Sequence, residues 1–233
     1  MLPPPRVVPR AAAPTNAVVM PLRHSRSAPP AVDSRARLLA AGLALAQRDG
    51  LRALSVRGVA AQAGANLGSF VYHFGTREAF VAELIESWYA PFYARLQAAA
   101  ATEGVPLARL RQLMLQLVDF MGEHRVFIGQ VLMDAAAGEK PARAFVQSLS
   151  NRHPRLLLAA IRDAQAAGSL RREDPVNALL FLLGGLVLPM LFVTGLARVG
   201  ILPRELGPRL QAQAADRAAL LSRFEWALRG LAP

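Results

Sequence analysis

The sequence lacks cysteine and contains little lysine and tyrosine. None of its 233 residues is cysteine, which excludes disulfide frameworks, cysteine nucleophiles and thiolate metal sites. Lys140 is the only lysine, so arginine supplies almost all of the 27 basic side chains. Tyrosine occurs three times and runs of β-branched residues are few, which argues against an all-β domain. These absences favour a helical protein.

Catalytic signatures are missing as well. The four histidines, His24, His73, His124 and His153, are far apart in the sequence and lack the H-E-x-x-H spacing of zinc enzymes. The sequence also has no Walker loop, no dinucleotide glycine motif and no nucleophile elbow. We therefore expect no enzyme activity, no catalytic residues, no metal site and no cofactor.

Acidic residues are scarce at the N-terminal end of the chain. The whole sequence has 27 basic and 16 acidic residues, a net charge of +11. Residues 1–80 hold ten arginines but only three acidic residues, so the first third carries most of the excess. A cationic excess favours an anionic partner, such as nucleic acid or a membrane surface. The first third is therefore the place to look for a nucleic-acid interface.

The chain divides by composition into an extension and a helical part. Residues 1–32 contain eight prolines and no acidic residue, so we expect a disordered Pro- and Arg-rich extension. Helical periodicity begins at Ser34 and predicts an all-α fold, with breaks at glycine and proline clusters. The first four helices are expected to start near Ser34, Ser55, Leu67 and Thr76. Later helices are predicted over about 105–121, 125–136, 140–167, 175–197 and 215–230.

The second and third of these helices are short and joined by a tight turn. Ser55 is placed to cap the second helix, Ala60 supplies a small residue where the two helices cross, and Gly64 lies where the chain must reverse. Phe70 is expected to anchor the third helix on the core. This arrangement predicts a helix-turn-helix unit, whose second member fits the major groove of DNA.

The groups around this unit suit the two kinds of contact that DNA offers. Side chains on the outer face of the third helix can read base edges, and arginines and helix caps can bind phosphates. The residues predicted to face outward are Asn66, Leu67, Ser69, Val71 and His73. Those predicted to bind phosphate are Arg35, Ser55, Arg57 and Arg77.

The same stretch resembles a known family. Residues 55–80, and above all the run Tyr-His-Phe-Gly-Thr-Arg-Glu-Ala at residues 72–79, resemble the DNA-binding domain of TetR-type transcriptional regulators. The resemblance covers about residues 34–85, and residues 225–231 resemble the usual final helix of the family. By position it adds Gly68 to the residues that would face DNA. Tyr72 is a further candidate for DNA binding, although we expect it to pack beneath the helix rather than to contact bases.

The resemblance also implies an organisation and a function. Residues 33–80 would form the DNA-binding domain, and residues 81–233 a helical domain for dimerisation and effector binding. The implied function is that of a cytoplasmic homodimer, most often a repressor, which binds a near-palindromic operator and responds to a small, largely apolar effector. Three positions depart from the family pattern. Ala46 stands where the first helix usually has a large aromatic residue, and Val71 and Leu67 are apolar, which favours contacts such as those to a thymine methyl group.

The predicted effector pocket rests on apolar and aromatic stripes. Such stripes are also typical of an ordinary core. The residues predicted to line the pocket are Trp88, Phe92, Met114, Leu117, Met121, Phe127, Phe145 and Phe181. Pro91 interrupts the fourth helix and should kink it, which we interpret as a route from the pocket to the DNA-binding domain.

Residues 175–197 carry no charge over about the length of a membrane span. One interpretation is a helix buried by its own domain and by a second subunit, which would form half of a four-helix bundle with the final helix. The predicted interface residues are Leu179, Leu183, Leu186, Leu220, Phe224 and Leu228. A second interpretation is a membrane anchor for a tethered DNA-binding protein. A third alternative is a helical small-molecule-binding protein without specific DNA binding.

Overall fold

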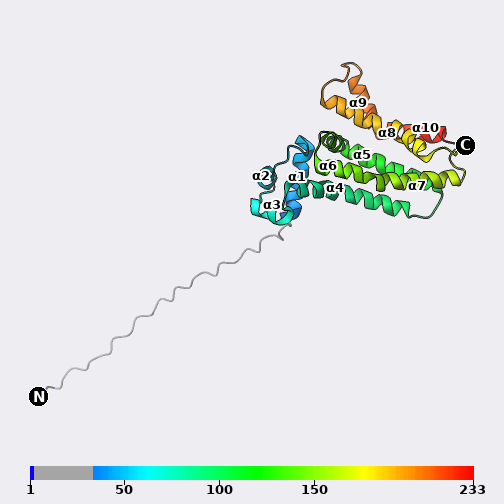
Figure 1. The fold of residues 1–233 in the computed structure, drawn as a ribbon. Helices are drawn as coiled ribbons and strands as arrows, with labels where there is room; N and C mark the ends of the chain where they lie inside the picture. The colour runs from blue at the N-terminus through cyan, green and yellow to red at the C-terminus, as the bar shows by residue number, and fades with distance from the viewer. Residues whose placement is uncertain (3–33) are drawn as a thin grey trace. The chain divides into compact units, whose positions relative to one another are not determined.

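The computed structural model describes residues 1–2 and 34–233, and every regular element in this part of the chain is helical. The predicted all-α fold is therefore confirmed. The extension expected over residues 1–32 lies outside the described residues, apart from its first two. The helices are α1 Ser34–Asp49, α2 Val56–Gln62, α3 Leu67–Phe74, α4 Arg77–Ala100, α5 Pro106–Ala136, α6 Lys140–Ser148, α7 His153–Ala166, α8 Pro175–Arg198, α9 Gly207–Ala215 and α10 Arg217–Gly230 (Figure 1).

A small aromatic core joins α1, α3 and the start of α4. The rings of Phe70 and Phe74 lie 5.0 and 4.9 Å from the ring of Phe80, measured between centroids, and all three are buried. Phe80 also covers Gly42 of α1, where a Cβ atom would come within 2.4 Å of its ring. Gly42 lies one helical turn before Ala46, which is buried too. Phe80 thus supplies the aromatic volume that the small residues of α1 leave open.

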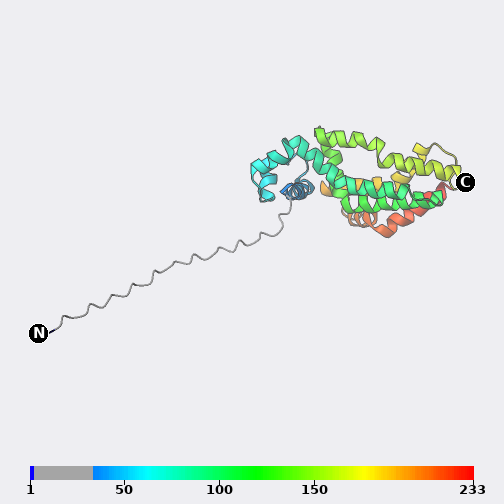
Figure 2. The same ribbon diagram turned by 90° about the horizontal axis from the view of Figure 1, so that it is seen from below.

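The long α5 is the centre of the C-terminal bundle. Its 31 residues extend over about 46 Å, and it packs against α4, α6, α7, α8 and α10. Figures 1 and 2 show α4, α5 and α7 running along one another, with α10 on the far side of α5. Ion pairs between Arg111 and Glu225 and between Asp119 and Arg217 hold α10 against α5.

Three helix assignments differ from those predicted. The sequence predicted a break between residues 121 and 125, but α5 continues through Gly122, because one glycine costs a packed helix only about 1 kcal/mol. The single helix predicted over 140–167 is instead α6, a 3-10 turn at Leu149–Asn151 and α7, since Pro154 lacks the N–H that a continuous helix would need. The prediction missed α9, whose Pro208 lies in the first turn, where proline is tolerated.

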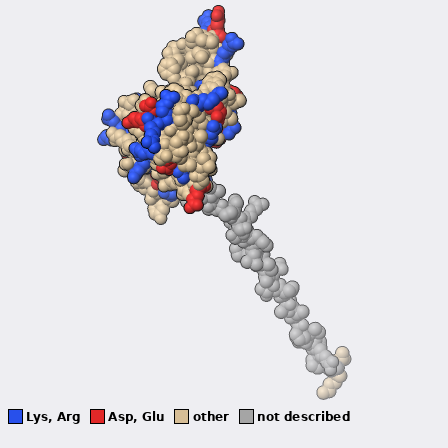
Figure 3. Space-filling view, turned by 90° about the vertical axis from the view of Figure 1, so that its right-hand side faces the viewer, with Lys and Arg blue, Asp and Glu red and all other residues tan. Residues whose placement is uncertain are grey.

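The end of the molecule farthest from α1–α3 carries charges of both signs. Figure 3 shows basic and acidic side chains interspersed on this face, with wide uncharged areas between them. Residues 81–233 contain 17 basic and 13 acidic residues, so the last two thirds of the chain are close to balanced. The surface in this view therefore offers no extended cationic field for nucleic acid.

Candidate DNA interface and ligand cavities

Helix α3 turns one face to the core and the other to solvent. Phe70 and Phe74 are buried, whereas Leu67, Val71 and Tyr72 are exposed. Asn66 caps the helix, because its side-chain oxygen accepts a hydrogen bond of 2.7 Å from the backbone N–H of Ser69. Gly68 is exposed and Ser69 is half-buried. The geometry is that of a recognition helix held by an aromatic anchor.

The turn before α3 has the predicted construction. Ser55 caps α2 by accepting a hydrogen bond of 3.1 Å from the backbone N–H of Gly58, and Ala60 is buried at the crossing of α2 and α3. Gly64 has a φ of +60°, the left-handed conformation that glycine adopts most readily. The cap, the small residue and the turn glycine are therefore confirmed as structural features.

Two side chains of α3 are placed differently from expectation. Tyr72 does not pack beneath the helix: it is 86% exposed, because the buried face of α3 is already filled by Phe70 and Phe74. His73 is half-buried and its Nε2 lies 2.6 Å from the hydroxyl of Ser34, the first residue of α1. Tyr72 is thus free to enter a DNA groove, whereas the imidazole of His73 already contacts Ser34 of α1.

The predicted phosphate-binding arginines fall into two groups. Arg57, in the first turn of α2, is exposed and forms no hydrogen bond or ion pair with another described residue. Arg35 pairs with Glu83 at 2.7 Å and lies over the ring of Phe74, at 5.9 Å from its centroid. Arg57 can therefore bind a phosphate without breaking another contact. Arg35 would first have to break its ion pair with Glu83.

Arg77 is a structural link and not an open phosphate site. Its guanidinium donates to the backbone oxygens of Leu54 and Leu51, both at 2.7 Å, and pairs with Glu139 at 2.9 Å. The side chain of Arg77 is 23% exposed and that of Glu139 only 10%. Four of its five N–H donors are used inside the subunit, so Arg77 would have to exchange partners to bind a phosphate, and that role stays a prediction.

A second contact joins the same loop to the C-terminal bundle. Asp134 of α5 accepts a hydrogen bond of 2.7 Å from the backbone N–H of Leu51. The loop after α1 is therefore held from two sides, by Asp134 directly and by Glu139 through Arg77. Helix α4 carries Arg77 at its start and runs on into the bundle, so the predicted boundary at residue 80 falls inside this helix and stays a prediction.

A small cavity matches much of the predicted pocket. It has a volume of about 160 Å³ and lies mainly between α4, α5 and α6, with His153 of α7 and Leu191 of α8 also on its lining. Five predicted residues line it: Trp88, Phe92, Leu117, Met121 and Phe145. The other three lie elsewhere: Met114 and Phe127 are buried in the core, and Phe181 is exposed beside Gly230.

Burial shifts the pKa values of Tyr89 and His153, which lie on the lining of this cavity. The hydroxyl of Tyr89 lies 2.9 Å from Nδ1 of His153. Burial lowers the pKa of His153 to about 4, with a smaller contribution from the charge of Arg152, and burial raises the pKa of Tyr89 to about 12. Both groups are therefore neutral at physiological pH. The pair is a polar site on the otherwise apolar lining of the small cavity.

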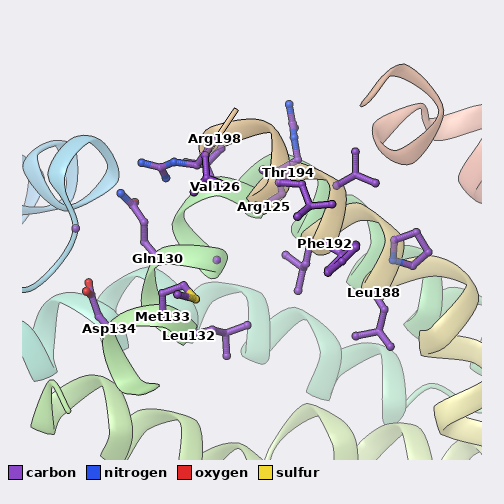
Figure 4. Close-up of a pocket in the computed structure, with 18 of the residues that line it drawn as sticks. Arg125, Val126, Gln130, Leu132, Met133, Asp134, Leu188, Phe192, Thr194 and Arg198 are labelled. Carbon is purple, nitrogen blue, oxygen red and sulfur yellow. The ribbon is translucent and has the colours of Figure 1, made fainter. Parts of the chain in front are cut away.

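A much larger cavity, which the sequence did not predict, opens between α5 and α8. Its volume is about 1030 Å³, and its floor includes Asp49 and Gly50 at the end of α1. Figure 4 shows Arg125, Val126 and Arg198 along its upper rim, with Leu132, Met133 and Asp134 below. No periodic pattern in the sequence indicates this site, because the cavity depends on the space between α5 and α8.

The predicted dimer residues are not on the surface. Leu179, Leu186, Leu220, Phe224 and Leu228 are buried within the subunit. Leu183 is partly buried and packs on the same core. These six residues form an apolar stripe, as predicted, but the stripe is the inner face of α8 and α10. The exposed apolar residues of these helices are Val176, Leu180, Phe181, Leu188, Phe192 and Trp226.

The fold and the site define a protein with an N-terminal helix-turn-helix unit and a C-terminal helical domain that contains two cavities, and comparisons with known proteins agree. The model "Bacterial regulatory proteins, tetR family" matches residues 38–84, and the model "Tetracyclin repressor-like, C-terminal domain" matches residues 103–188. The HTH-type transcriptional repressor KstR2 of Mycolicibacterium smegmatis is 27% identical over 130 residues, 55% of this chain and 63% of that protein. The match thus spans less than two thirds of that relative.

Solved structures share the fold. The SmeT–triclosan complex, whose protein is from Stenotrophomonas maltophilia, has a TM-score of 0.64 and 23% identity, covering 86% of this chain and 92% of that one. A TetR transcription regulator from Haloarcula marismortui also has a TM-score of 0.64, with 16% identity, covering 85% and 98%. The chain belongs to the TetR family of transcriptional regulators.

Proposed function

We propose that this chain is a cytoplasmic, ligand-responsive repressor that binds a near-palindromic operator as a homodimer. The observation that carries the proposal is α3, which is capped by Asn66, anchored by two buried phenylalanines and exposed along its outer face. Two such helices in a dimer, about 34 Å apart, would enter successive major grooves on one side of the duplex. Arg57 and the N-terminus of α2 would bind phosphate.

The dimer would use the outer faces of α8 and α10. Leu180, Phe181 and Trp226 are large, apolar and exposed in the isolated subunit. Phe181 lies against Gly230, one turn after Trp226, so the two helices present a joint apolar surface. Exposed apolar patches of this kind mark interaction sites. We therefore move the predicted interface from the buried residues of these helices to this outer face.

The effector would be a small, largely apolar molecule held in the C-terminal domain. SmeT, which has the same fold, has a solved structure in complex with triclosan. Binding would favour a dimer in which the two copies of α3 have a different spacing, and DNA affinity would fall according to the effector's preference for that state.

A membrane-tethered protein is the second candidate, because α8 is long and apolar enough to cross a membrane. The helix has 24 residues and a most apolar window with a mean hydropathy of 2.4, of which 28% is buried. However, Leu182, Leu186 and Met190 of α8 pack into the subunit core. Fractionation without detergent separates the two: the dimer stays in the supernatant, and a tethered protein sediments with membranes.

Selection of bound DNA from a random pool tests the proposal directly. We expect enrichment of a two-fold symmetric site, and light scattering should give the mass of a dimer at the same protein concentration. Replacing Tyr72 by alanine should weaken binding to the selected site, whereas Arg172→Gln, an exposed charge in the loop between α7 and α8, should not. A pool that shows no enrichment would overturn the assignment.

A further inference from the structure

The larger cavity contains three glycines that packing within the subunit does not require. A Cβ atom added at Gly129, Gly184 or Gly195 would meet no other atom within 4 Å, with the helix's own backbone left aside. All three lie inside helices, where glycine is less favourable than alanine. Their small size leaves room in the cavity for another molecule.

The walls around these glycines are apolar and open. Met133 of α5 is 71% exposed and Phe192 of α8 is 67% exposed, and Leu188 and Val199 also face the cavity in an exposed state. The volume of about 1030 Å³ lies at the upper end of the range for ligand sites, whereas the smaller cavity of about 160 Å³ lies below it. The larger cavity therefore has the size and the surface for a ligand.

The charges on the lining are not balanced once internal partners are counted. Asp49 pairs with Arg48 at 2.7 Å, whereas the hydrogen bond that Asp134 accepts from the backbone N–H of Leu51 does not neutralise a carboxylate, so two arginines face one unpaired acidic residue on the described lining. Arg125 donates to the backbone oxygen of Gly122, but neither Arg125 nor Arg198 has a carboxylate partner among the described residues. The two arginines therefore leave the rim cationic, and an anionic group is the complement.

We propose that the cavity between α5 and α8 binds an amphipathic anion, a molecule with an extended apolar chain and one carboxylate. The carboxylate would lie at Arg125 and Arg198, and the chain would run along Gly129 and Met133. The stretch of α5 from Arg125 to Asp134 is about 14 Å long, which suits an extended chain and not a compact ring.

Occupancy of this site would act on the DNA-binding domain by a short route. The cavity floor includes Gly50 and Asp134, and Asp134 holds the backbone of Leu51. A chain that presses on Asp134 would change the loop between α1 and α2, whose carbonyls are held by Arg77. This regulatory step rests on the proposed function, whereas binding of the anion does not.

Direct binding to the full-length protein tests the site without DNA. Titration calorimetry with decanoate, decan-1-ol and decylamine compares three equal chains with different heads. We expect decanoate to bind at least about tenfold more tightly than the other two, because it alone can pair with the arginines. The double variant Arg125→Gln with Arg198→Gln should remove this preference and leave binding of the alcohol unchanged.

A filling variant locates the ligand, and the chain offers a matched control. Gly129→Leu places a side chain in the cavity, whereas Gly122→Leu, two turns earlier on α5, does not, and an added Cβ atom at Gly122 also meets no other atom within 4 Å. We expect Gly129→Leu to weaken decanoate binding at least about tenfold and Gly122→Leu to leave it unchanged. Circular dichroism of both variants checks that the fold is kept.

Three results would overturn the proposal: equal affinity for the three head groups, equal effects of the two glycine variants, or an effect of Gly129→Leu on dimer dissociation but not on decanoate. The last result would assign the cavity to a second copy of the chain. Operator binding is measured separately on the selected DNA. Decanoate that binds but does not release the operator would refute the regulatory route alone, and absence of any operator would refute the proposed function while the binding site stands.

Discussion

Replacing Arg77 by methionine removes the contact that ties the loop after α1 to the C-terminal bundle. The variant keeps the aliphatic part of the side chain and loses the bonds to Leu51, Leu54 and Glu139. Removing one partner of a fully buried ion pair costs about 3–5 kcal/mol. Because the Arg77 side chain is half-buried and not fully desolvated, we expect a loss of about 3 kcal/mol in the free energy of unfolding.

Urea unfolding measures this loss, and salt-dependent DNA binding separates it from a role at the phosphate backbone. The urea midpoint of Arg77→Met should fall with little change in slope, since the same surface is exposed on unfolding. The logarithmic salt slope of operator binding should stay as in the parent protein. Arg57→Met should do the opposite, with unchanged stability and a slope smaller by about one unit. If Arg77→Met costs less than about 1 kcal/mol, or lowers the slope as Arg57→Met does, the structural role of Arg77 is wrong.

Three further variants test other parts of the structure. The pKa of His153 is about 4 in the fold against an ordinary value of about 6.5, so the unfolded state binds more protons between these values and stability falls as the pH drops from about 6.5 towards 4. His153→Gln, which keeps a partner for Tyr89, should remove up to about 3 kcal/mol of this acid sensitivity in pH-dependent thermal melts. Gly42→Ala should destabilise the protein by about 1–3 kcal/mol in urea unfolding, because its Cβ would overlap the buried ring of Phe80; unchanged stability would mean that the ring moves freely. Val71→Ser should change the preferred base at one operator position in a repeated selection and leave the salt slope unchanged.

The DNA-binding unit could be predicted from the sequence because its signals are local. Ser55 and Gly64 act within a few residues of the chain, through a cap and a turn, and Phe70 shares the buried face of α3 with Phe74, one helical turn later. The residue types therefore carry the information by themselves. The ion pair of Arg77 could not be predicted from local residue types, since its partner Glu139 lies 62 positions further along the sequence.

The C-terminal domain shows where sequence patterns stop being sufficient. An apolar stripe on α8 or α10 fits the subunit core and a dimer interface equally well, so Leu186 and Phe224 were assigned to the wrong surface. Only the packing of α8 against α5 and α10 decides which stripe faces inward. The large cavity likewise depends on the space between two helices, a tertiary property that no periodicity records.

The apolar outer face of α3 has a thermodynamic consequence for operator recognition. Leu67, Val71 and Tyr72 would pass from water into the groove on specific binding, which removes apolar surface from solvent. Specific association should therefore carry a negative heat-capacity change, and its enthalpy should become more favourable as the temperature rises. Binding to random DNA, held by Arg57 and its neighbours through phosphates alone, should lack that signature. Temperature, and not only ionic strength, would then separate the two modes of binding.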